Sequence, residues 1–193
     1  MSSSHAALEN TLLQVRAFTP QQLALIGSHA TEKQYSAGEY FAEAGRKPQE
    51  IGFVADGIFR VGYFDKAGND VTKYFVEENN FLVDLHSYQY QLPSAEYLQA
   101  VTDATLLVFK ASAWQSLAHT IADWPQTESF LVSRALLQKV QRISPLVNED
   151  ATTRYLSFLE KFPALANRIP LAYLASYIGI TPQSLSRIRK KLS

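Results

Sequence analysis

A cluster of basic residues ends the sequence, in the segment GITPQSLSRIRKKLS at 179–193. Residues 161–193 contain six basic residues and no acidic one, although the whole chain has 18 Lys and Arg against 18 Asp and Glu. Basic side chains neutralise phosphates, and arginine and glutamine also form paired hydrogen bonds with base edges. The end of the chain therefore has the side chains that DNA binding requires. Charge alone leaves a solvated basic tail as the alternative.

Apolar spacing puts these basic residues on the second of two short helices. Leu174, Ala175 and Ile178 share one helical face, and Gly179 permits a tight turn after them. Thr181, followed by proline, is typical of the N-cap of a second helix. This pattern predicts a helix-turn-helix, in which the second helix enters the major groove of DNA. The alternative is an ordinary helical hairpin with a basic edge.

The polar face of this second helix holds the candidate DNA contacts. Its residues lie on the side opposite the apolar residues that pack against the first helix. Glutamine suits adenine and arginine suits guanine, whereas lysines suit phosphates. We expect Gln183, Ser184 and Arg187 to contact bases, and Thr181, Arg189, Lys190 and Lys191 to contact phosphates.

The middle of the chain has the pattern of an antiparallel β-domain. Six of the eight glycines lie between Gly38 and Gly68, and they separate short β-prone runs. These runs predict an antiparallel sandwich, barrel or roll. Before it, residues 5–30 predict one or two helices, with Thr19 as an N-cap and Pro20 as the first helical residue.

A long helix is predicted over 126–144. It begins after a Trp-Pro pair at 124–125 and ends at a Ser-Pro pair at 144–145. Its apolar residues occupy more than one side, so it must pack against two partners. One is the β-domain, and we expect the other to be the same helix of a second copy, through Phe130, Leu137 and Val140. A helix wrapped entirely by its own domain is the alternative. A hinge is expected near 144–148, with Asn148 as the N-cap of the next helix.

Across nearly its whole length the sequence resembles the CRP/FNR-type transcription regulators. SAGEYFAEAG at 36–45 resembles the opening Gly-Glu turn of that family's cyclic-nucleotide-binding roll. The run 51–81 resembles its strands and hairpin, and ITPQSLSRIRKKL at 180–192 resembles its recognition helix. The resemblance implies an α+β fold with an N-terminal antiparallel β-roll, a dimer helix and a C-terminal helix-turn-helix. The expected domains are 1–124, 125–147 and 148–193.

Two departures from the family change the expected function. Val83-Asp84 stands where the family has Gly-Glu for the ribose, and Ser94-Ala95 stands where it has Arg-Ser for the cyclic phosphate. Residues 74–109 contain no arginine, and a buried phosphate needs a cationic partner. We therefore do not expect cyclic AMP to bind. The chain also stops one residue after Leu192, so we expect a helix-turn-helix domain without a C-terminal wing.

The former nucleotide site is either filled by side chains or lined for another small molecule. Its candidate lining residues are Phe81, Asp84, His86, Ser94 and Tyr97. Asp84 and His86 are two residues apart and would share one face of a strand. Because no histidines have metal-binding spacing, we expect no metal there.

Composition excludes several other functions. Without cysteine the chain has no disulfide and no cysteine-held metal, which fits the cytoplasm. It has no signal peptide, no membrane span and no phosphate loop or nucleophile motif, so we expect neither an enzyme nor a membrane protein. The expected function is a dimeric DNA-binding regulator, with double-stranded DNA, a second copy and RNA polymerase as candidate partners. The alternative is a dimeric sensor of another small molecule or a protein partner, with weak or no DNA binding.

Overall fold

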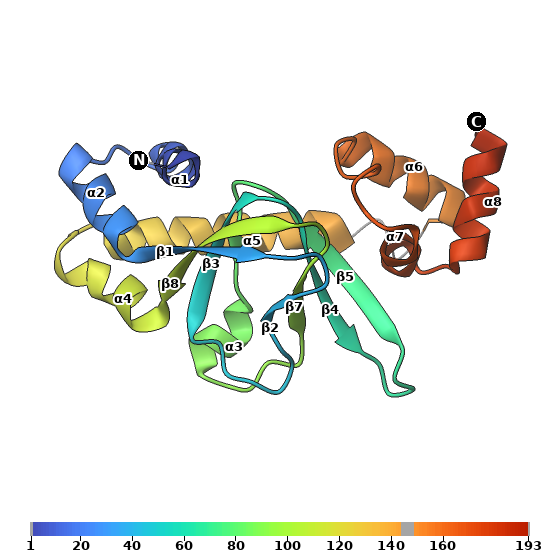
Figure 1. Ribbon diagram of the computed structural model, residues 1–193, viewed down its shortest axis with the longest axis horizontal. Coiled ribbons are helices and arrows are strands. Elements are labelled where there is room, and N and C mark those ends of the chain that lie inside the picture. The colour runs from blue at the N-terminus through green and yellow to red at the C-terminus, as the bar shows by residue number, and fades with distance from the viewer. Residues whose placement is uncertain (1, 144–148, 193) are drawn as a thin grey trace.

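The computed structural model describes residues 2–143 and 149–192 of the 193-residue chain. Figure 1 shows an elongated molecule with strands at its centre, one long helix running along them, and helices at both ends. The N-terminal helices lie toward one end and the C-terminal helices form the other. Among the described helices, none combines the length and hydropathy that a membrane crossing requires.

Two helices precede the strands, as the sequence predicts. Helix α1 spans Ser3–Leu13 and α2 spans Pro20–Ser28. The Thr19 hydroxyl accepts a hydrogen bond from the Gln22 backbone N–H, and the Gln22 side chain accepts one from the Thr19 N–H. This reciprocal capping box satisfies two donors that a helix start leaves unpaired, and it confirms the expected N-cap.

The strands form two antiparallel four-stranded sheets that pack face to face as a roll. One sheet has the order β1-β8-β3-β6 and the other β2-β7-β4-β5. Apolar residues from both sheets form the core between them, including Val54, Phe59, Leu98 and Leu106. The strands are β1 Ala30–Tyr35, β2 Tyr40–Ala42, β3 Glu50–Asp56, β4 Phe59–Phe64, β5 Asp70–Val76, β6 Phe81–Leu82, β7 Tyr97–Ala100 and β8 Ala104–Lys110.

A short helix replaces the strand expected around Asp84. Helix α3 spans Leu85–Tyr90, and the Asp84 carboxylate accepts a hydrogen bond from the Ser87 N–H at 3.3 Å. Asp84 is therefore the N-cap of this helix, because a short carboxylate satisfies the first free N–H groups. The prediction that Asp84 and His86 share a strand face is wrong.

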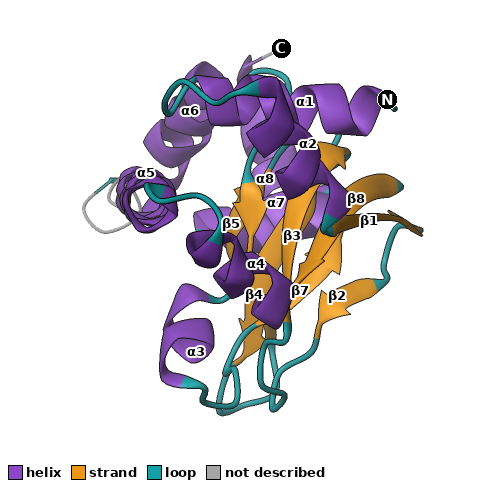
Figure 2. Cartoon of the chain, turned by 90° about the vertical axis from the view of Figure 1, so that its left-hand side faces the viewer, coloured by secondary structure: helices purple, strands orange, loops and turns teal. Residues whose placement is uncertain are grey.

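Helix α5 spans Trp124–Ile143 and lies along one side of the strands, where Figure 2 views it nearly end-on. It follows α4, which spans Ala111–Ser116, and a short 3-10 turn at Leu117–His119. Trp124, Thr127 and Leu131 face inward and are buried. Trp124 and Leu131 belong to the core cluster that contains Trp114 and the apolar residues of α1, so α5 is anchored mainly at its start.

Three helices complete the chain: α6 Ala151–Lys161, α7 Leu171–Ile178 and α8 Pro182–Leu192. Asp150 caps α6, since its carboxylate accepts hydrogen bonds from the Thr152 and Thr153 N–H groups. The N-cap of this helix is therefore two residues later than the one expected from the sequence. The expected N-cap Asn148 and the hinge at 144–148 lie outside the described residues.

Candidate nucleic-acid interface and effector cavity

Helices α7 and α8 form the expected helix-turn-helix. Gly179 ends α7 with φ of 77°, a left-handed conformation that glycine adopts at little steric cost. The Thr181 hydroxyl then accepts a hydrogen bond from the Ser184 N–H at 3.2 Å and caps α8. Ala175 and Leu185 are fully buried, so a small residue on α7 lets α8 pack closely.

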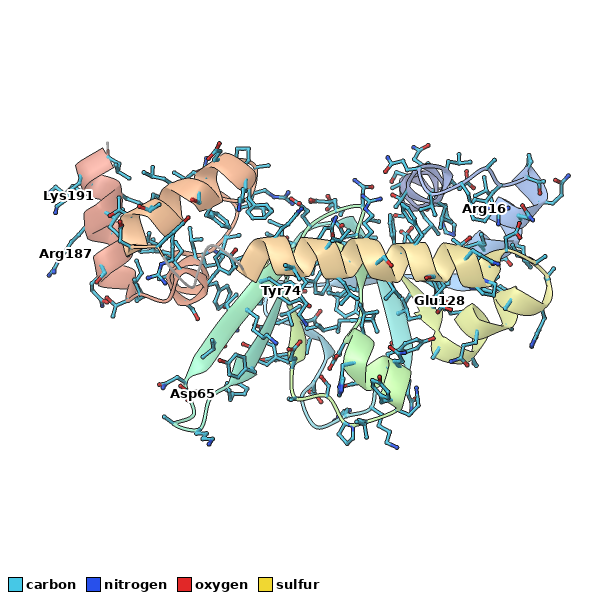
Figure 3. All side chains as sticks on the ribbon, turned by 180° about the vertical axis from the view of Figure 1, so that it is seen from behind. Arg16, Asp65, Tyr74, Glu128, Arg187 and Lys191 are labelled. Atoms are coloured by element: carbon cyan, nitrogen blue, oxygen red, sulfur yellow. The ribbon has the colours of Figure 1, made fainter. Side chains whose placement is uncertain are left out.

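The outward face of α8 has the side chains predicted to contact DNA. Gln183, Arg187, Lys190 and Lys191 are all exposed. Figure 3 shows Arg187 and Lys191 at the extreme end of the molecule, pointing away from the roll and from α5. A basic helix face at one pole, with nothing of the described chain covering it, has the shape that major-groove binding requires.

Three of the predicted contacts have intramolecular partners in the structure. The Thr181 hydroxyl donates to the Ser184 hydroxyl at 3.0 Å, and Ser184 is half-buried. The Arg189 guanidinium lies 5.6 Å from the Tyr155 ring centroid, and its Nη2 donates to the Ala166 carbonyl at 3.5 Å. Arg189 therefore packs between α8 and the loop after α6 rather than on the outward face.

A cavity of about 790 Å³ lies between α5, α3 and the roll. This volume is in the range of small-molecule sites. Figure 3 labels Tyr74 beside the C-terminal half of α5 and Glu128 toward its N-terminal end, and both residues line the cavity. Of the five predicted lining residues, Phe81, Asp84 and His86 line the cavity, whereas Ser94 and Tyr97 are absent from its lining.

Ser94 is buried and its hydroxyl is fully used by neighbouring groups. It donates to the Asp84 carboxylate at 2.6 Å and lies 2.8 Å from the Glu96 carbonyl, and it accepts from the Glu96 N–H at 3.0 Å. Burial alone would raise the pKa of the Asp84 carboxyl, but the hydrogen bonds from Ser94 and Ser87 and the charge of Lys139 hold that pKa below its ordinary value. Asp84 is therefore an anion at neutral pH, and its carboxylate accepts a hydrogen bond from Ser94, the residue that stands at the expected phosphate position.

The Tyr97 side chain is also buried within the roll. Its ring lies over Gly62, where a Cβ atom would collide with the tyrosine ring and hydroxyl. The hydroxyl donates to the Asp70 carboxylate, and burial together with that hydrogen bond raises the pKa of Tyr97. Tyr97 is therefore a buried structural residue, and the prediction that it lines an effector pocket is not supported by the geometry.

The charges that line the cavity are mainly negative. Asp84, Glu96 and Glu128 contribute carboxylates and Lys139 contributes one ammonium group, and no arginine is among the described side chains that line the cavity. Lys73 pairs with Glu96, and Trp114 Nε1 donates to Glu128 at 2.9 Å. Lys139 was not predicted as a lining residue, because it lies far along the chain from residues 74–109, where the nucleotide site was expected. Lys139 comes from α5, and its Nζ lies 5.4 Å from the Tyr74 ring centroid.

Neither a metal site nor a covered dimer face is present in the described part of the chain. No group of three His, Cys, Asp or Glu side chains there has the arrangement to hold a metal ion. Phe130, Leu137 and Val140, the residues predicted to form the dimer helix, are 50%, 65% and 64% exposed on α5. Exposure of three large apolar side chains on one helix is unusual for an isolated soluble chain.

No protein-family model and no curated protein sequence matches the chain. Solved structures do match it. FixK2 from Bradyrhizobium japonicum has a TM-score of 0.73 at 17% identity, over 84% of this chain and 84% of that one. The c-di-GMP responsive global regulator CLP from Xanthomonas campestris has a TM-score of 0.73 at 16% identity, over 90% and 91%.

A transcriptional regulator assigned to the CRP/FNR family from Eubacterium rectale has a TM-score of 0.70 at 15% identity, over 91% of this chain and 83% of that one. The chain thus has the α+β fold of CRP/FNR-type regulators, as the resemblance in its sequence predicted. At these identities the matches establish the fold alone.

Proposed function

We propose that this protein is a CRP/FNR-type transcriptional regulator that binds near-palindromic operator DNA as a homodimer. The observation that carries the proposal is the exposed face of α8, where Gln183, Arg187, Lys190 and Lys191 project from one end of the molecule. This face belongs to a capped and well-packed helix-turn-helix, so its side chains are held on a rigid element. Such a helix enters the major groove with its N-terminal residues toward the bases.

The positions along α8 suggest a division of roles. Gln183 and Arg187 suit adenine and guanine edges near the start and middle of the helix. Lys190 and Lys191 suit phosphates, which add affinity without sequence information. Thr181 and Ser184 fix the first turn through their shared hydrogen bond, and from there Ser184 remains a candidate base contact. Arg189 stabilises the packing beneath α8, although we expected it to contact a phosphate.

The homodimer is proposed to form through α5. Phe130 and Leu137 are seven residues apart, and Val140 follows three residues later. This is the spacing of an a/d seam in a two-stranded coiled coil. A parallel pair of α5 helices would bring both copies of α8 to the same end, as reading two half-sites about one helical turn apart requires. RNA polymerase stays a candidate partner of the DNA-bound dimer.

Cyclic AMP is not proposed as the effector. A cyclic phosphate at the expected position beside Ser94 would lie close to the Asp84 carboxylate, and the Ser94 hydroxyl already donates to Asp84 and the Glu96 carbonyl. A buried anion without cationic or multiple donor groups is costly. Among the described lining residues, Lys139 is the one cation that could offset this cost.

The cavity supports a second candidate function. A volume of about 790 Å³ with many apolar lining residues suits a small molecule other than a cyclic nucleotide. In this alternative the protein is a dimeric sensor of that molecule or of a partner protein, with weak or no binding to DNA. The two functions differ in whether α8 contacts phosphates.

A salt titration separates the two functions. Fluorescence anisotropy would follow the protein binding a labelled random-sequence duplex between about 50 and 200 mM salt, where phosphate-based binding weakens steeply. Lys190→Ala should weaken binding and reduce the salt dependence by about one counterion. Lys47→Ala removes an exposed lysine from the roll and is the matched control. Absence of binding by the parent protein at low salt would refute the DNA-binding proposal.

A further inference from the structure

A buried arginine lies where the roll meets the C-terminal helices. Arg60 is on β4, and its side chain is only 3% exposed. Its guanidinium donates to both Asp70 carboxylate oxygens, at 3.0 and 2.7 Å, to the Thr72 hydroxyl at 3.1 Å and to Gln99 Oε1 at 2.8 Å. These partners all belong to the roll. They fix the plane of the guanidinium, because bidentate pairing with a carboxylate is geometrically specific.

Two tyrosine rings lie over this guanidinium. The Tyr97 ring centroid is 5.1 Å from the Arg60 Cζ atom, and the Tyr173 ring centroid is 3.8 Å from it. A guanidinium attracts the face of an aromatic ring, and the attraction is stronger where water is excluded. Tyr173 belongs to α7, the first helix of the helix-turn-helix. The roll therefore presents a fixed cationic surface to the DNA-binding unit.

A second contact from α7 covers the open edge of a sheet. Strand β5 is an edge strand, so the outer backbone groups of its residues have no neighbouring strand. The Ser176 hydroxyl accepts from the Thr72 N–H at 3.0 Å and donates to the Asp70 carbonyl at 3.2 Å. Ser176 is three residues after Tyr173 and therefore lies on the same side of α7. One helix face makes both contacts.

Apolar and charged contacts extend this docking. The Phe75 ring lies 5.5 Å from the Tyr177 ring and 6.3 Å from the Phe158 ring, and it belongs to the core of the C-terminal helices. On the other side, Arg168 pairs with Glu78 at 2.5 Å, and Glu78 also accepts from the Gly57 N–H at 3.0 Å. The docked unit is thus held by one continuous core with polar contacts around it.

In this docked position α8 faces away from the rest of the protein. Figure 3 shows Arg187 and Lys191 on the far side of the molecule from α5 and the roll. If α7 left β5, none of the contacts described above would fix the direction in which α8 points. A dimer whose two recognition helices are free to reorient pays an ordering cost when it binds two half-sites together.

We infer that Tyr173 and Ser176 are positioning residues for DNA reading, which hold α8 in its presenting orientation by docking α7 onto Arg60 and the edge of β5. This inference rests on the proposed function. Neither residue touches DNA in this account. They act by keeping the binding-competent orientation populated, and the apparent affinity falls in proportion to that population.

The test compares two duplexes and two variants. One duplex carries the full operator enriched by the parent protein from a random library, and the other carries a single half-site. Tyr173→Leu combined with Ser176→Ala removes the ring and the edge hydrogen bonds. Tyr173→Phe is the matched control, because it keeps the ring over Arg60. A half-site is bound by one α8 whatever its orientation, so it reports whether the reading face is intact.

Docking itself is measured with spin labels. The chain has no cysteine, so Lys66→Cys at the β4–β5 turn and Glu160→Cys at the end of α6 provide the only two labelling sites. Both positions are exposed. The labelled chain is mixed with a large excess of unlabelled chain, so that distances within one copy dominate. Double electron–electron resonance then gives the distribution of distances between the two labels, one on the roll and one on the C-terminal helices.

We expect the parent and Tyr173→Phe to give one narrow distance and equal affinities. The double variant should give a broad distribution and bind the full operator about tenfold more weakly, as a tenfold lower competent fraction dictates, with half-site affinity unchanged. A distance that stays narrow, or full-operator binding that is unchanged or tighter, would overturn the positioning role alone. If the parent binds neither duplex, the proposed function fails and the positioning role fails with it.

Discussion

The Ser94 hydroxyl donates a 2.6 Å hydrogen bond to the Asp84 carboxylate, and this bond joins the two segments in which the sequence departs from the nucleotide-binding pattern that it resembles. The Asp84 carboxylate is thus a negative charge within the protein, and the Ser94 hydroxyl donates a hydrogen bond to it. An anionic ligand would have to displace that bond and then lie beside the carboxylate. A phosphate site needs a cation or several hydrogen-bond donors, whereas this region has a carboxylate whose donor is already used.

From this pair we expect cyclic AMP and cyclic GMP to leave the melting temperature unchanged at millimolar concentration. A ligand present at 100 times its Kd would add about 2.7 kcal/mol to the free energy of unfolding. That increase would raise the melting midpoint by several degrees for a domain of this size. Differential scanning fluorimetry measures it directly. A reproducible rise with either nucleotide would mean that Lys139 or another group replaces the missing arginine.

Ser94→Ala should reduce the free energy of unfolding by about 1–2 kcal/mol, because the partly buried Asp84 carboxylate loses the hydrogen bond from Ser94 and keeps only those from Ser87. The Asp84 pKa is lowered in the folded protein, so this stabilisation is present above its ordinary value of 3.8 and is lost as the pH falls through the folded value. Urea unfolding at pH 7 and below about pH 4 measures the change. Ser186→Ala, at an exposed position of α8, is the control. A difference between Ser94→Ala and the parent that does not shrink in acid would contradict the charged hydrogen bond.

Leu137→Glu should convert the dimer into monomers at micromolar concentration. The side chain is 65% exposed in the single chain, so the substitution costs little in the monomer, whereas two copies would bury two carboxylates against one another. Sedimentation velocity distinguishes the two states. Leu156→Glu changes a similarly exposed leucine on α6 and should remain a dimer. A parent protein that sediments as a monomer would remove the basis for the α5 pairing.

Arg189→Ala should reduce the free energy of unfolding more than it reduces affinity for random-sequence duplex. The reason is that its guanidinium lies against Tyr155 and the Ala166 carbonyl rather than on the outward face. Lys191→Ala should do the opposite, since Lys191 is exposed at the pole. Thermal unfolding and anisotropy, measured on the same preparations, separate the two effects. Equal losses of affinity in both variants would indicate that Arg189 contacts a phosphate, as the sequence predicted.

Much of the fold could be predicted because its elements follow local rules. The capping box at Thr19, the strands punctuated by glycine and the Gly179 turn all depend on neighbours in the sequence. Strand β1 could not be predicted this way, because ATEKQY has four polar residues in a row and no apolar alternation, and it is a strand through its pairing with β8. Helix α3 was missed for a similar reason, since its cap Asp84 is held by Ser94 from a distant turn.

The site was predictable where one helix face determines it and unpredictable where separate elements meet. The spacing of Gln183, Arg187, Lys190 and Lys191 predicted their common exposure on α8. Arg189 was expected to contact a phosphate because of its charge, and the sequence does not show that its side chain packs against Tyr155. The contact of Arg60 with Tyr173 joins residues more than a hundred positions apart, and only the packing of α7 on β5 brings them together.

The central claim is that α8 reads DNA, and selection of duplexes from a random library tests it most directly. The parent protein should enrich a near-palindromic sequence with half-sites about one helical turn apart. Arg187→Ala should lose the preference at one base position in each half-site and bind the parent's sequence about 1–3 kcal/mol more weakly. No enriched sequence with the parent, or the same full preference with Arg187→Ala, would contradict the claim.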